Sequence, residues 1–514
     1  MNNKNLKNIK SDIISARLKQ SKQRSIDTET TEKNDDLLNG KYEALFSKCF
    51  SHDADGLPNG LDIEKLLKAL ESGEQIDFDA LTIAGARKLA NPQAALAVEL
   101  SGADPEGVSM PKPPTLNSKQ CAAEMIEIYE KNILRHCPFS TISSSDPQVD
   151  LDRAVNVLNS FGSAFTGPKI GGVVTRKSLF RGSTVGDLVG PFISQFMLLD
   201  VPLGNQTISQ RGPTKIGEYG ITEANWVEIQ KGNVPVAQTI NSDLKYIYSP
   251  EQLGSFVHID FVYQAHLYAA AILLNEGAAR QSGFVSQTNE GAFVDNGGDA
   301  EIAAAIGEIS RHALKACWVQ KWRKHLKLRP EEMAGRIVKI QDGDLSSSLI
   351  HADLLTLGAD TIAAVKAHNL AAGGEEKAWL PLQYAEGSPT HPSYPAGHAV
   401  IAGACSTILK IYFADADWST LGLGVYESLD GTQLNTYAGD DVADITIHGE
   451  INKLASNMSI GRNMAGVHYR SDGEQGMILG EKVAVQWFKD AKESYNINIG
   501  SISFTGFAGN TITI

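Results

Sequence analysis

The stretch Ser388-Pro-Thr-His-Pro-Ser-Tyr-Pro-Ala-Gly-His398 is the most informative part of the sequence for fold and site. Its three prolines fix the backbone, remove hydrogen-bond donors and push the residues before them toward extended geometry. A run of small and apolar residues with helical character follows at 398–413. A stiff loop that leads into a helix N-terminus offers free N–H groups to an anion. The stretch therefore predicts an anion site, although on its own it also fits a purely structural turn.

Two further segments carry the cations that such a site needs. One runs from Lys321 to Pro330 and the other from Arg462 to Asp472. Together the three segments read K-x7-RP, P-x-GH and R-x5-H-x3-D. Their order and spacing resemble the vanadium-dependent haloperoxidases and the related bacterial acid phosphatases and lipid phosphatases. The longer strings WVQKW…LRPEE and SPTHPSYPxGHA resemble the bromoperoxidase branch of red algae and cyanobacteria.

The resemblance implies a mainly α fold, with a helical-bundle core of the vanadium haloperoxidase and acid phosphatase type and minor β-hairpins. We expect a polar N-terminal arm over residues 1–40 and one large domain over 41–514. Within this domain we expect an N-terminal helical subregion (41–115), an oxyanion-site core (300–490) and a terminal hairpin (495–514). Apolar spacing predicts helices at 61–70, 80–89, 118–131, from Asp150, near 187–198, and at 258–280, 300–328, 350–371, 398–413 and 474–490.

Composition excludes several other classes of protein. The chain has 514 residues, of which 42% are hydrophobic and 21% charged, so it can bury a large core. Its net charge of −14 argues against a nucleic-acid-binding surface. The five cysteines are widely spaced without a CxxC motif, so we expect buried thiols and not a disulfide scaffold or zinc site. We see no secretory signal or membrane span and expect a soluble, cytoplasmic protein.

The resemblance implies vanadate as the cofactor. Lys321, Arg329 and Arg462 would supply positive charge, and Gly397 would donate its backbone N–H to an equatorial oxygen. Arginine suits an oxyanion because its guanidinium is planar and permanently charged. Lys321 would also polarise bound peroxide. His468 matches the histidine that binds vanadium in haloperoxidases and attacks phosphorus in phosphatases.

Four other residues complete the implied site. His398 matches an acid–base histidine that would deprotonate incoming peroxide. Asp472 matches a carboxylate that orients His468, but it could equally be the N-cap of the helix that follows. His391 matches a position that holds histidine in bromoperoxidases and phenylalanine in the fungal chloroperoxidase. Trp318 matches an aromatic residue near the halide-access side, although a core tryptophan is the simpler interpretation of this residue alone.

The chain departs from the family pattern at Ala396, where a serine commonly precedes Gly-His. The missing hydroxyl removes one neutral donor, which costs about 1 kcal/mol. We therefore expect vanadate still to bind, with weaker oxidation that favours iodide or bromide over chloride. Elsewhere, the acidic run from Asp295 to Asp299 is a candidate structural calcium site, although a solvated turn is the simpler interpretation.

The sequence thus predicts a vanadium-dependent haloperoxidase that oxidises bromide or iodide with hydrogen peroxide. The hypohalous product would halogenate a small organic acceptor. Two alternatives stay open: a soluble phosphatase with His468 as nucleophile, and a catalytically impaired oxyanion-binding relative. Haloperoxidases of this branch form large symmetric oligomers, so we expect a homo-oligomer, anywhere from a dimer to a dodecamer, without a nucleic-acid partner.

Overall fold

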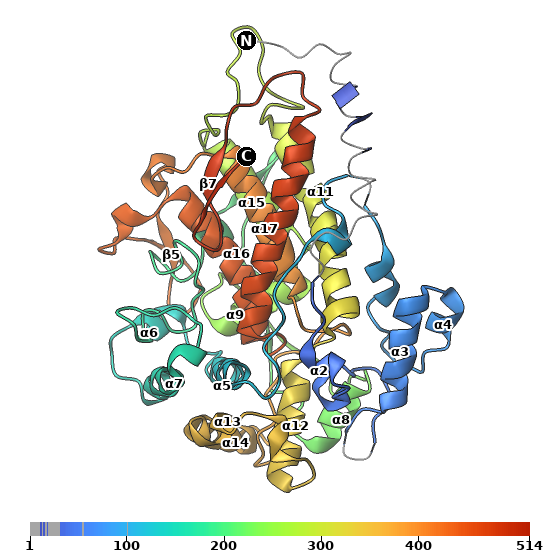
Figure 1. Ribbon diagram of the computed structural model, residues 1–514. Coiled ribbons are helices and arrows are strands. Elements are labelled where there is room, and N and C mark those ends of the chain that lie inside the picture. Colours follow the sequence, from blue (N-terminus) through green and yellow to red (C-terminus); the bar gives the residue numbers. More distant parts are fainter. Residues whose placement is uncertain (1–10, 13, 16–17, 19–30, 54–55, 100) are drawn as a thin grey trace.

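The computed structural model describes residues 11–12, 14–15, 18, 31–53, 56–99 and 101–514 (Figure 1). Most of the expected N-terminal arm, residues 1–40, lies outside the described residues. Its described end is attached to the rest of the molecule. The Asn34 side chain donates to the His325 carbonyl oxygen at 3.0 Å, and the Leu116 N–H donates to Asp36 Oδ2 at 3.0 Å. Residues 34–36 therefore pack with the folded body.

Regular structure is mainly helical, and strands occur only as short antiparallel pairs in the described part of the chain, which confirms the predicted fold class. The α-helices are α2 (Asp35–Leu38), α3 (Gly60–Ser72), α4 (Gln75–Asp79), α5 (Lys119–Ile133), α6 (Phe139–Ser143), α7 (Val149–Ser160), α8 (Glu223–Gln230), α9 (Pro250–Ile259), α10 (Gln264–Asn275), α11 (Asp299–Trp318), α12 (Pro330–Asp342), α13 (Asp353–Thr356), α14 (Ala359–Ala371), α15 (Gly397–Tyr412), α16 (Ile447–Met464) and α17 (Arg470–Lys492). The strand pairs are β1 (Val201–Leu203) with β2 (Gln206–Ile208), β3 (Gly212–Ile216) with β4 (Thr239–Lys245), β5 (Val425–Glu427) with β6 (Leu434–Thr436), and β7 (Ser503–Thr505) with β8 (Thr511–Thr513).

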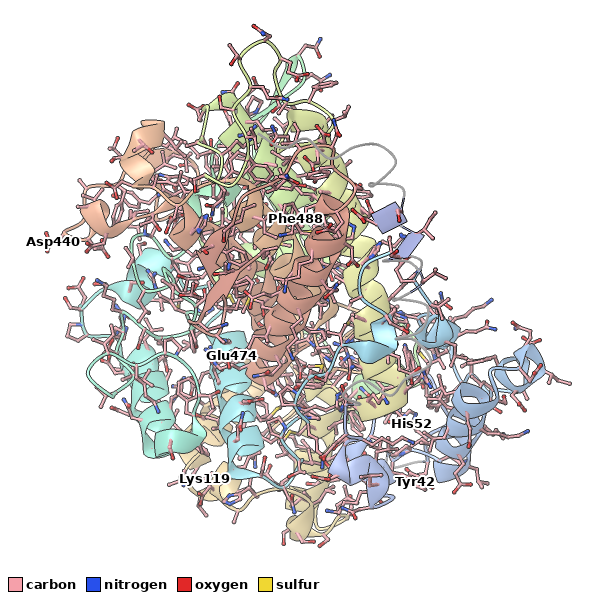
Figure 2. The ribbon with its side chains drawn as sticks, turned by 45° about the horizontal axis from the view of Figure 1, so that its top comes forward. Tyr42, His52, Lys119, Asp440, Glu474 and Phe488 are labelled. Atoms are coloured by element: carbon pink, nitrogen blue, oxygen red, sulfur yellow. The ribbon has the colours of Figure 1, made fainter. Side chains whose placement is uncertain are left out.

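The core is a bundle of long helices in the middle of the molecule, with α11, α15, α16 and α17 side by side (Figure 1). Figure 2 shows α17 from Glu474 near its start to Phe488 near its end. Glycines let α15 and α17 approach closely. A Cβ on Gly403 would lie 2.2 Å from the Met477 carbonyl oxygen, and one on Gly480 would lie 2.1 Å from the Val400 carbonyl oxygen. The two backbones are therefore in direct contact.

We expect Gly403→Ala to lower the free energy of unfolding by about 1–3 kcal/mol, because an added methyl has no room against a backbone carbonyl. This loss outweighs the gain in helix propensity, which is at most about 1 kcal/mol. Urea denaturation followed by circular dichroism measures the change. Gly424→Ala is the matched control, since a Cβ there meets nothing within 4 Å. Equal stability of the two variants would contradict the close packing of α15 and α17.

The segment between α11 and α12 departs from the continuous helix expected at 300–328. The α-helix ends at Trp318 and continues as a π-helical segment, Val319–His325. Leu326 then adopts a left-handed conformation, with φ of 44°, and breaks the chain direction. Arg329 is extended at the N-cap of α12, in agreement with the bias that a following proline imposes. Arg329 thus opens a new helix and does not close the preceding one.

Other expected helices are interrupted or absent. The helix expected at 258–280 is two helices, α9 and α10, which meet at 98°. The one at 350–371 is divided into α13 and α14. Residues 80–89 are irregular, and near 187–198 only a 3₁₀ turn forms, Gln195–Met197. In that last region Gly186 and Gly190 have φ of 99° and 71°, which no α-helix accommodates.

Two other expectations concern membranes and thiols. Among the described residues, no single helix is long and apolar enough to cross a membrane, although the bent pair α9 and α10 together meets the length and composition test. All five cysteines are free, and four of them are buried.

Candidate active site

His468 lies in the short connection between α16 and α17, where it is only 2% exposed. Its Nδ1 donates to Asp472 Oδ2 at 2.9 Å, which leaves the lone pair on Nε2. The same Asp472 oxygen accepts the Tyr469 N–H at 3.0 Å. Tyr469, and not Asp472, is the N-cap of α17, so the interpretation of Asp472 as the N-cap is wrong. Asp472 orients the histidine and also satisfies a free N–H at the start of the helix.

Three buried cations gather next to this histidine. Lys321 Nζ donates to the Pro392 and Ser393 carbonyl oxygens at 2.6 and 2.9 Å. Arg329 Nη1 donates to His468 Nε2 at 2.9 Å. Arg462 donates through Nη1 to a carbonyl oxygen, whereas its Nε is buried without a hydrogen-bond partner among the described residues.

The cations are held at an electrostatic cost. Burial, reinforced by the neighbouring Arg329 charge, lowers the pKa of Lys321 to about 7. Burial and the nearby Arg462 lower the pKa of Arg329 to about 9. Burial, followed by the charges of Arg329 and Lys321, also holds the pKa of His468 well below its usual range. Buried cations normally pair with carboxylates. Here their described hydrogen bonds go to carbonyl oxygens and histidine nitrogens, so an anion would relieve the repulsion.

The start of α15 lines the same cavity as Arg462 and His468. Ala396 is the N-cap of the helix and is fully buried, and its N–H donates to the Asp472 carbonyl oxygen at 2.9 Å. Gly397 lines a cavity, and a Cβ there would make ordinary van der Waals contacts with Trp318 and Leu314 at 3.8 and 3.9 Å. His398 Nε2 donates to Asp260 Oδ1 at 2.9 Å, and Asp260 occupies the break between α9 and α10. The sequence prediction missed Asp260, for which the only signal is a lone carboxylate in an apolar run.

His391 and Trp318 complete the predicted set. His391 Nδ1 accepts a hydrogen bond from Arg329 Nη2 at 2.9 Å, so this side chain contacts one of the cations directly. Its ring centroid lies 5.0 Å from that of Trp318. The Trp318 indole N–H donates to the Ala90 carbonyl oxygen at 3.0 Å, and Trp318 lines the same cavity as Gly397. Trp318 therefore combines a structural contact with a position at the site.

These side chains surround a cavity of about 350 Å³. Six of them line it, namely Trp318, His391, Gly397, His398, Arg462 and His468, whereas Lys321, Arg329, Ala396 and Asp472 are not part of its lining. The lining also includes residues that the sequence prediction missed, among them Arg87, His258, Tyr384 and Glu386. One wall is apolar, from Val262, Leu314, Pro389 and Ile401.

The N-terminal subregion holds the proline-rich loop in place. Lys48 Nζ donates to the carbonyl oxygens of Glu386 and Ser388 at 2.8 and 2.7 Å. Arg87 Nη1 donates to the same two oxygens at 3.1 and 3.3 Å. Lys48 also forms a buried ion pair with Glu331 at 2.7 Å. The loop that leads to His398 is thus fastened by cations from the first hundred residues.

At the rim of the cavity, His258 forms a second polar group. Its Nε2 donates to Glu386 Oε1 at 2.6 Å, and its ring stacks on Tyr384 with centroids 3.8 Å apart. The Lys215 ammonium contacts the other ring nitrogen. Hydrogen bonding from His258 helps to hold the pKa of Glu386 down, at about 2, against the opposing effect of burial. The rim therefore carries an ionised carboxylate.

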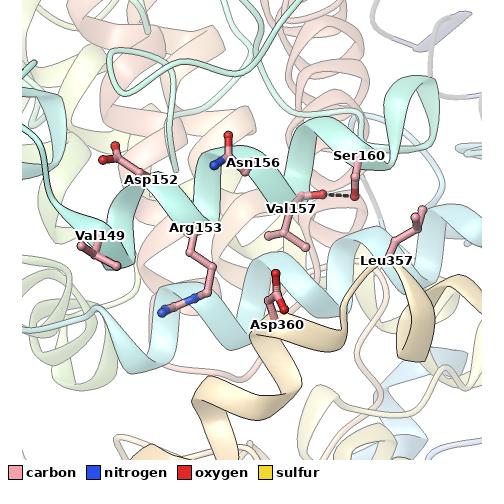
Figure 3. A pocket seen from close by; sticks show the side chains of 8 residues that line it. All are labelled: Val149, Asp152, Arg153, Asn156, Val157, Ser160, Leu357 and Asp360. Atoms are coloured by element: carbon pink, nitrogen blue, oxygen red, sulfur yellow. Dashed lines mark hydrogen bonds between the residues drawn. The ribbon is translucent and has the colours of Figure 1, made fainter.

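A larger hollow of about 550 Å³ lies away from the motif residues, along α7 and the start of α14 (Figure 3). Its lining contains one cation, Arg153, which already pairs with Glu130 and Asp150. This groove lacks the free positive charge of the smaller cavity, which is therefore the better candidate for the site.

Comparisons with known proteins agree with this geometry. The family described as "VCPO second helical-bundle domain" matches residues 303–496, the region of most site residues. A vanadium-dependent bromoperoxidase of Corallina pilulifera is 30% identical, over 93% of this chain and 92% of its own length. The chain belongs to the vanadium-dependent haloperoxidase family. The haloperoxidase prediction is thus confirmed, and the phosphatase alternative is not favoured.

Two further relatives extend the comparison. A vanadium-dependent bromoperoxidase of Ascophyllum nodosum is 32% identical over 78% of this chain and 72% of its own length. The solved structure of the second vanadate-dependent bromoperoxidase (AnII) from the same alga superposes with a TM-score of 0.89. It is 25% identical in sequence and covers 98% of this chain and 90% of that protein, which is described as homohexameric. The haloperoxidase fold therefore extends over nearly the whole chain.

The calcium candidate gains no support from the geometry. Asp299 pairs with Arg280 at 3.0 Å, and the Asn296 side chain is engaged with Val285. Among the described residues there is no group of three or more His, Cys, Asp or Glu side chains that could hold a metal ion.

Proposed function

We propose that this haloperoxidase binds vanadate in the cavity beside His468 and oxidises bromide or iodide with hydrogen peroxide. The observation that carries the proposal is the convergence of three buried cations, Lys321, Arg329 and Arg462, on a histidine whose Nδ1 is engaged by Asp472. The names of the relatives support vanadium dependence and bromide as a substrate of those proteins.

The residues present fit an oxyanion. Arg462 Nε is buried and has no hydrogen-bond partner among the described residues, and Arg462 and Gly397 line the same cavity. One imidazole among cations suits an anionic metal oxide, whereas zinc requires several nitrogen or sulfur ligands. Lys321, Arg329, Arg462 and the Gly397 N–H would hold the oxygens, and His468 Nε2 would be the ligand. Bound vanadate supplies Lewis acidity that activates peroxide toward halide without a change in oxidation state.

The remaining chemistry belongs to side chains of this protein. Halide oxidation consumes one halide ion, one hydrogen peroxide and one proton, and yields hypohalous acid and water. His398 donates from Nε2 to Asp260, so Nδ1 is the nitrogen that exchanges protons with peroxide in the cavity. Lys321 adds positive charge behind the bound anion. His391 and Trp318 border the route by which halide arrives.

We also propose that residues 41–514 act as one unit and that the protein is a homo-oligomer. The main hydrophobic core contains residues from Ala44 to Ile514, which supports a single unit, and Arg87 brings the N-terminal subregion to the cavity. The homohexameric AnII supports oligomerisation. A nucleophilic small molecule is the organic acceptor that the halogenating product requires.

Halide oxidation by the vanadium-free protein, measured before and after addition of orthovanadate, tests the proposal. Iodide, bromide and chloride are assayed separately with hydrogen peroxide. We expect turnover only after vanadate is added, with iodide and bromide ahead of chloride. Bound vanadate without turnover would contradict the proposed reaction. Phosphate-ester hydrolysis by the vanadium-free protein, together with no halide oxidation after vanadate is added, would instead support the phosphatase alternative.

Ala396→Ser should strengthen this activity. The hydroxyl would lie at the N-cap of α15, beside Gly397, and add one neutral donor to the oxyanion. One such hydrogen bond contributes about 1 kcal/mol, which corresponds to about a fivefold gain in vanadate affinity. Titration of the vanadium-free protein with vanadate gives the affinity, and initial rates with bromide give the activity. Lower affinity in the serine variant would contradict the assignment of this position to the anion site.

A further inference from the structure

Lys327 lies behind Asp472, in the short link between the π-helical segment and α12. The residue is 2% exposed, and its Nζ is 3.6 Å from Asp472 Oδ1. Among the described residues, neither Lys327 Nζ nor Asp472 Oδ1 has a hydrogen-bond partner. The ammonium also lies 4.1 Å from the ring centroid of Tyr469 and 5.8 Å from that of Tyr394. This lysine does not line the cavity, and the reaction described above does not use it.

The two oxygens of Asp472 face different partners. Oδ2 accepts hydrogen bonds from His468 Nδ1 and the Tyr469 N–H, and the Ser393 hydroxyl also donates to it. Oδ1 faces the Lys327 ammonium. A buried ammonium without hydrogen bonds is costly unless an opposite charge and polarisable groups compensate it. Asp472 supplies that charge, and the faces of Tyr469 and Tyr394 add cation–π stabilisation.

We propose that Lys327 is a positioning residue that acts on His468 through Asp472. Its charge balances the buried carboxylate, so Asp472 retains the hydrogen bond from His468 Nδ1. The lone pair then stays on Nε2, where it accepts from Arg329 Nη1 in this structure and where an oxyanion would bind. The inference goes beyond the residues assigned above, and it rests on the proposed function only for the identity of that oxyanion.

The Lys327 charge also acts on a second carboxylate, Glu124, where it opposes the rise in pKa that burial causes. Its two oxygens are already engaged, since Oε2 accepts from the Ser471 hydroxyl at 2.8 Å and Oε1 accepts from the Gln120 side chain at 3.0 Å. Asp472 Oδ1 has no such partner. The geometry therefore favours Asp472 as the group that Lys327 serves.

Lys327→Met, made in the full-length protein, tests the proposal through vanadate affinity. Partners that orient a ligand histidine contribute about 10- to 100-fold in affinity, and we expect a loss of that size. Lys131→Met is the matched control: Lys131 is also a buried lysine, paired with Glu127 at 3.0 Å, and Arg470 still compensates Glu127 when the lysine is removed. The control should bind vanadate like the parent protein. Equal affinities of Lys327→Met and the parent would overturn the proposal.

Two measurements guard against an effect on folding alone. In the Asp472→Asn background, Lys327→Met should cause little further loss of affinity; a loss as large as in the parent would show that Lys327 does not act through Asp472. In the vanadium-free protein, ¹⁵N NMR of labelled histidines should show the His468 Nδ1–H signal weakened or shifted by Lys327→Met. An unchanged signal would overturn the proposal. This readout holds even if the parent protein binds no vanadate, a result that would contradict the proposed function instead.

Discussion

His468→Ala should abolish vanadate-dependent halide oxidation, because the substitution removes the nitrogen assigned as the ligand. We expect vanadate affinity to fall by about 100-fold or more, beyond the range that outer partners of a ligand histidine contribute. Titration of the vanadium-free protein with vanadate measures the affinity, and triiodide formation measures turnover. The folded core should persist, because of the three cations only Arg329 loses a hydrogen bond, the one to His468 Nε2. Arg329, Lys321 and Arg462 each keep a hydrogen bond to a backbone carbonyl oxygen.

His448→Ala is the control for this experiment. His448 is also a buried histidine and lies near the start of α16, the helix that leads to the site. Its Nε2 is 2.8 Å from the Phe413 carbonyl oxygen. It does not line the cavity. This variant should lose stability but bind vanadate normally. Full turnover in His468→Ala would show that another group holds the cofactor.

His398→Ala should lower kcat for halide oxidation by about 10²- to 10⁴-fold, the usual contribution of general acid–base catalysis. Vanadate affinity should change much less, because Lys321, Arg329 and Arg462 are retained. Asp260→Asn should have a smaller effect on kcat, about 10- to 100-fold, since it disturbs only the partner of the histidine. Stopped-flow assays at saturating vanadate measure kcat, and titration of the vanadium-free protein with vanadate measures the affinity.

The double variant His398→Ala/Asp260→Asn decides whether Asp260 acts through His398. If it does, the kcat of the double variant equals that of His398→Ala, because nothing is left for the aspartate to orient. Additive losses would mean that Asp260 contributes separately, for example through the break between α9 and α10. A kcat of His398→Ala close to that of the parent would remove this histidine from the reaction.

The sequence predicts those site residues that lie close to one another in the chain. Gly397 and His398 are neighbours at the start of α15, and Arg462, near the end of α16, lies a few residues before His468. Asp260 could not be predicted in the same way. Its hydrogen-bond partner His398 lies 138 residues later in the sequence, and the residues next to Asp260 in the sequence are mostly apolar. Arg87 is a similar case, since a lone arginine in an irregular segment resembles any solvated charge.

Helix prediction failed mainly in the centre of the molecule. α16 is buried along its whole length, and several of its polar residues have tertiary partners, such as Glu450, whose Oε2 accepts the Gln195 N–H at 2.8 Å. A helix buried on all sides has no polar face, so apolar spacing does not reveal it. α12 was missed for the same reason, being buried from Pro330 to Lys339. The fold class was nevertheless correct, because it followed from the motifs and not from periodicity.

The contact between Lys48 and the Ser388 carbonyl oxygen joins positions 340 residues apart. During synthesis at about 5–20 residues per second, Lys48 leaves the ribosome roughly 20–70 seconds before the loop that it will fasten. Until then this cation, which is fully buried in the finished protein, has none of its loop partners. His468 follows later still. A nascent chain that has passed Ser388 but has not reached His468 can therefore form the contact of Lys48 with the loop, while it still lacks the histidine assigned as the vanadate ligand.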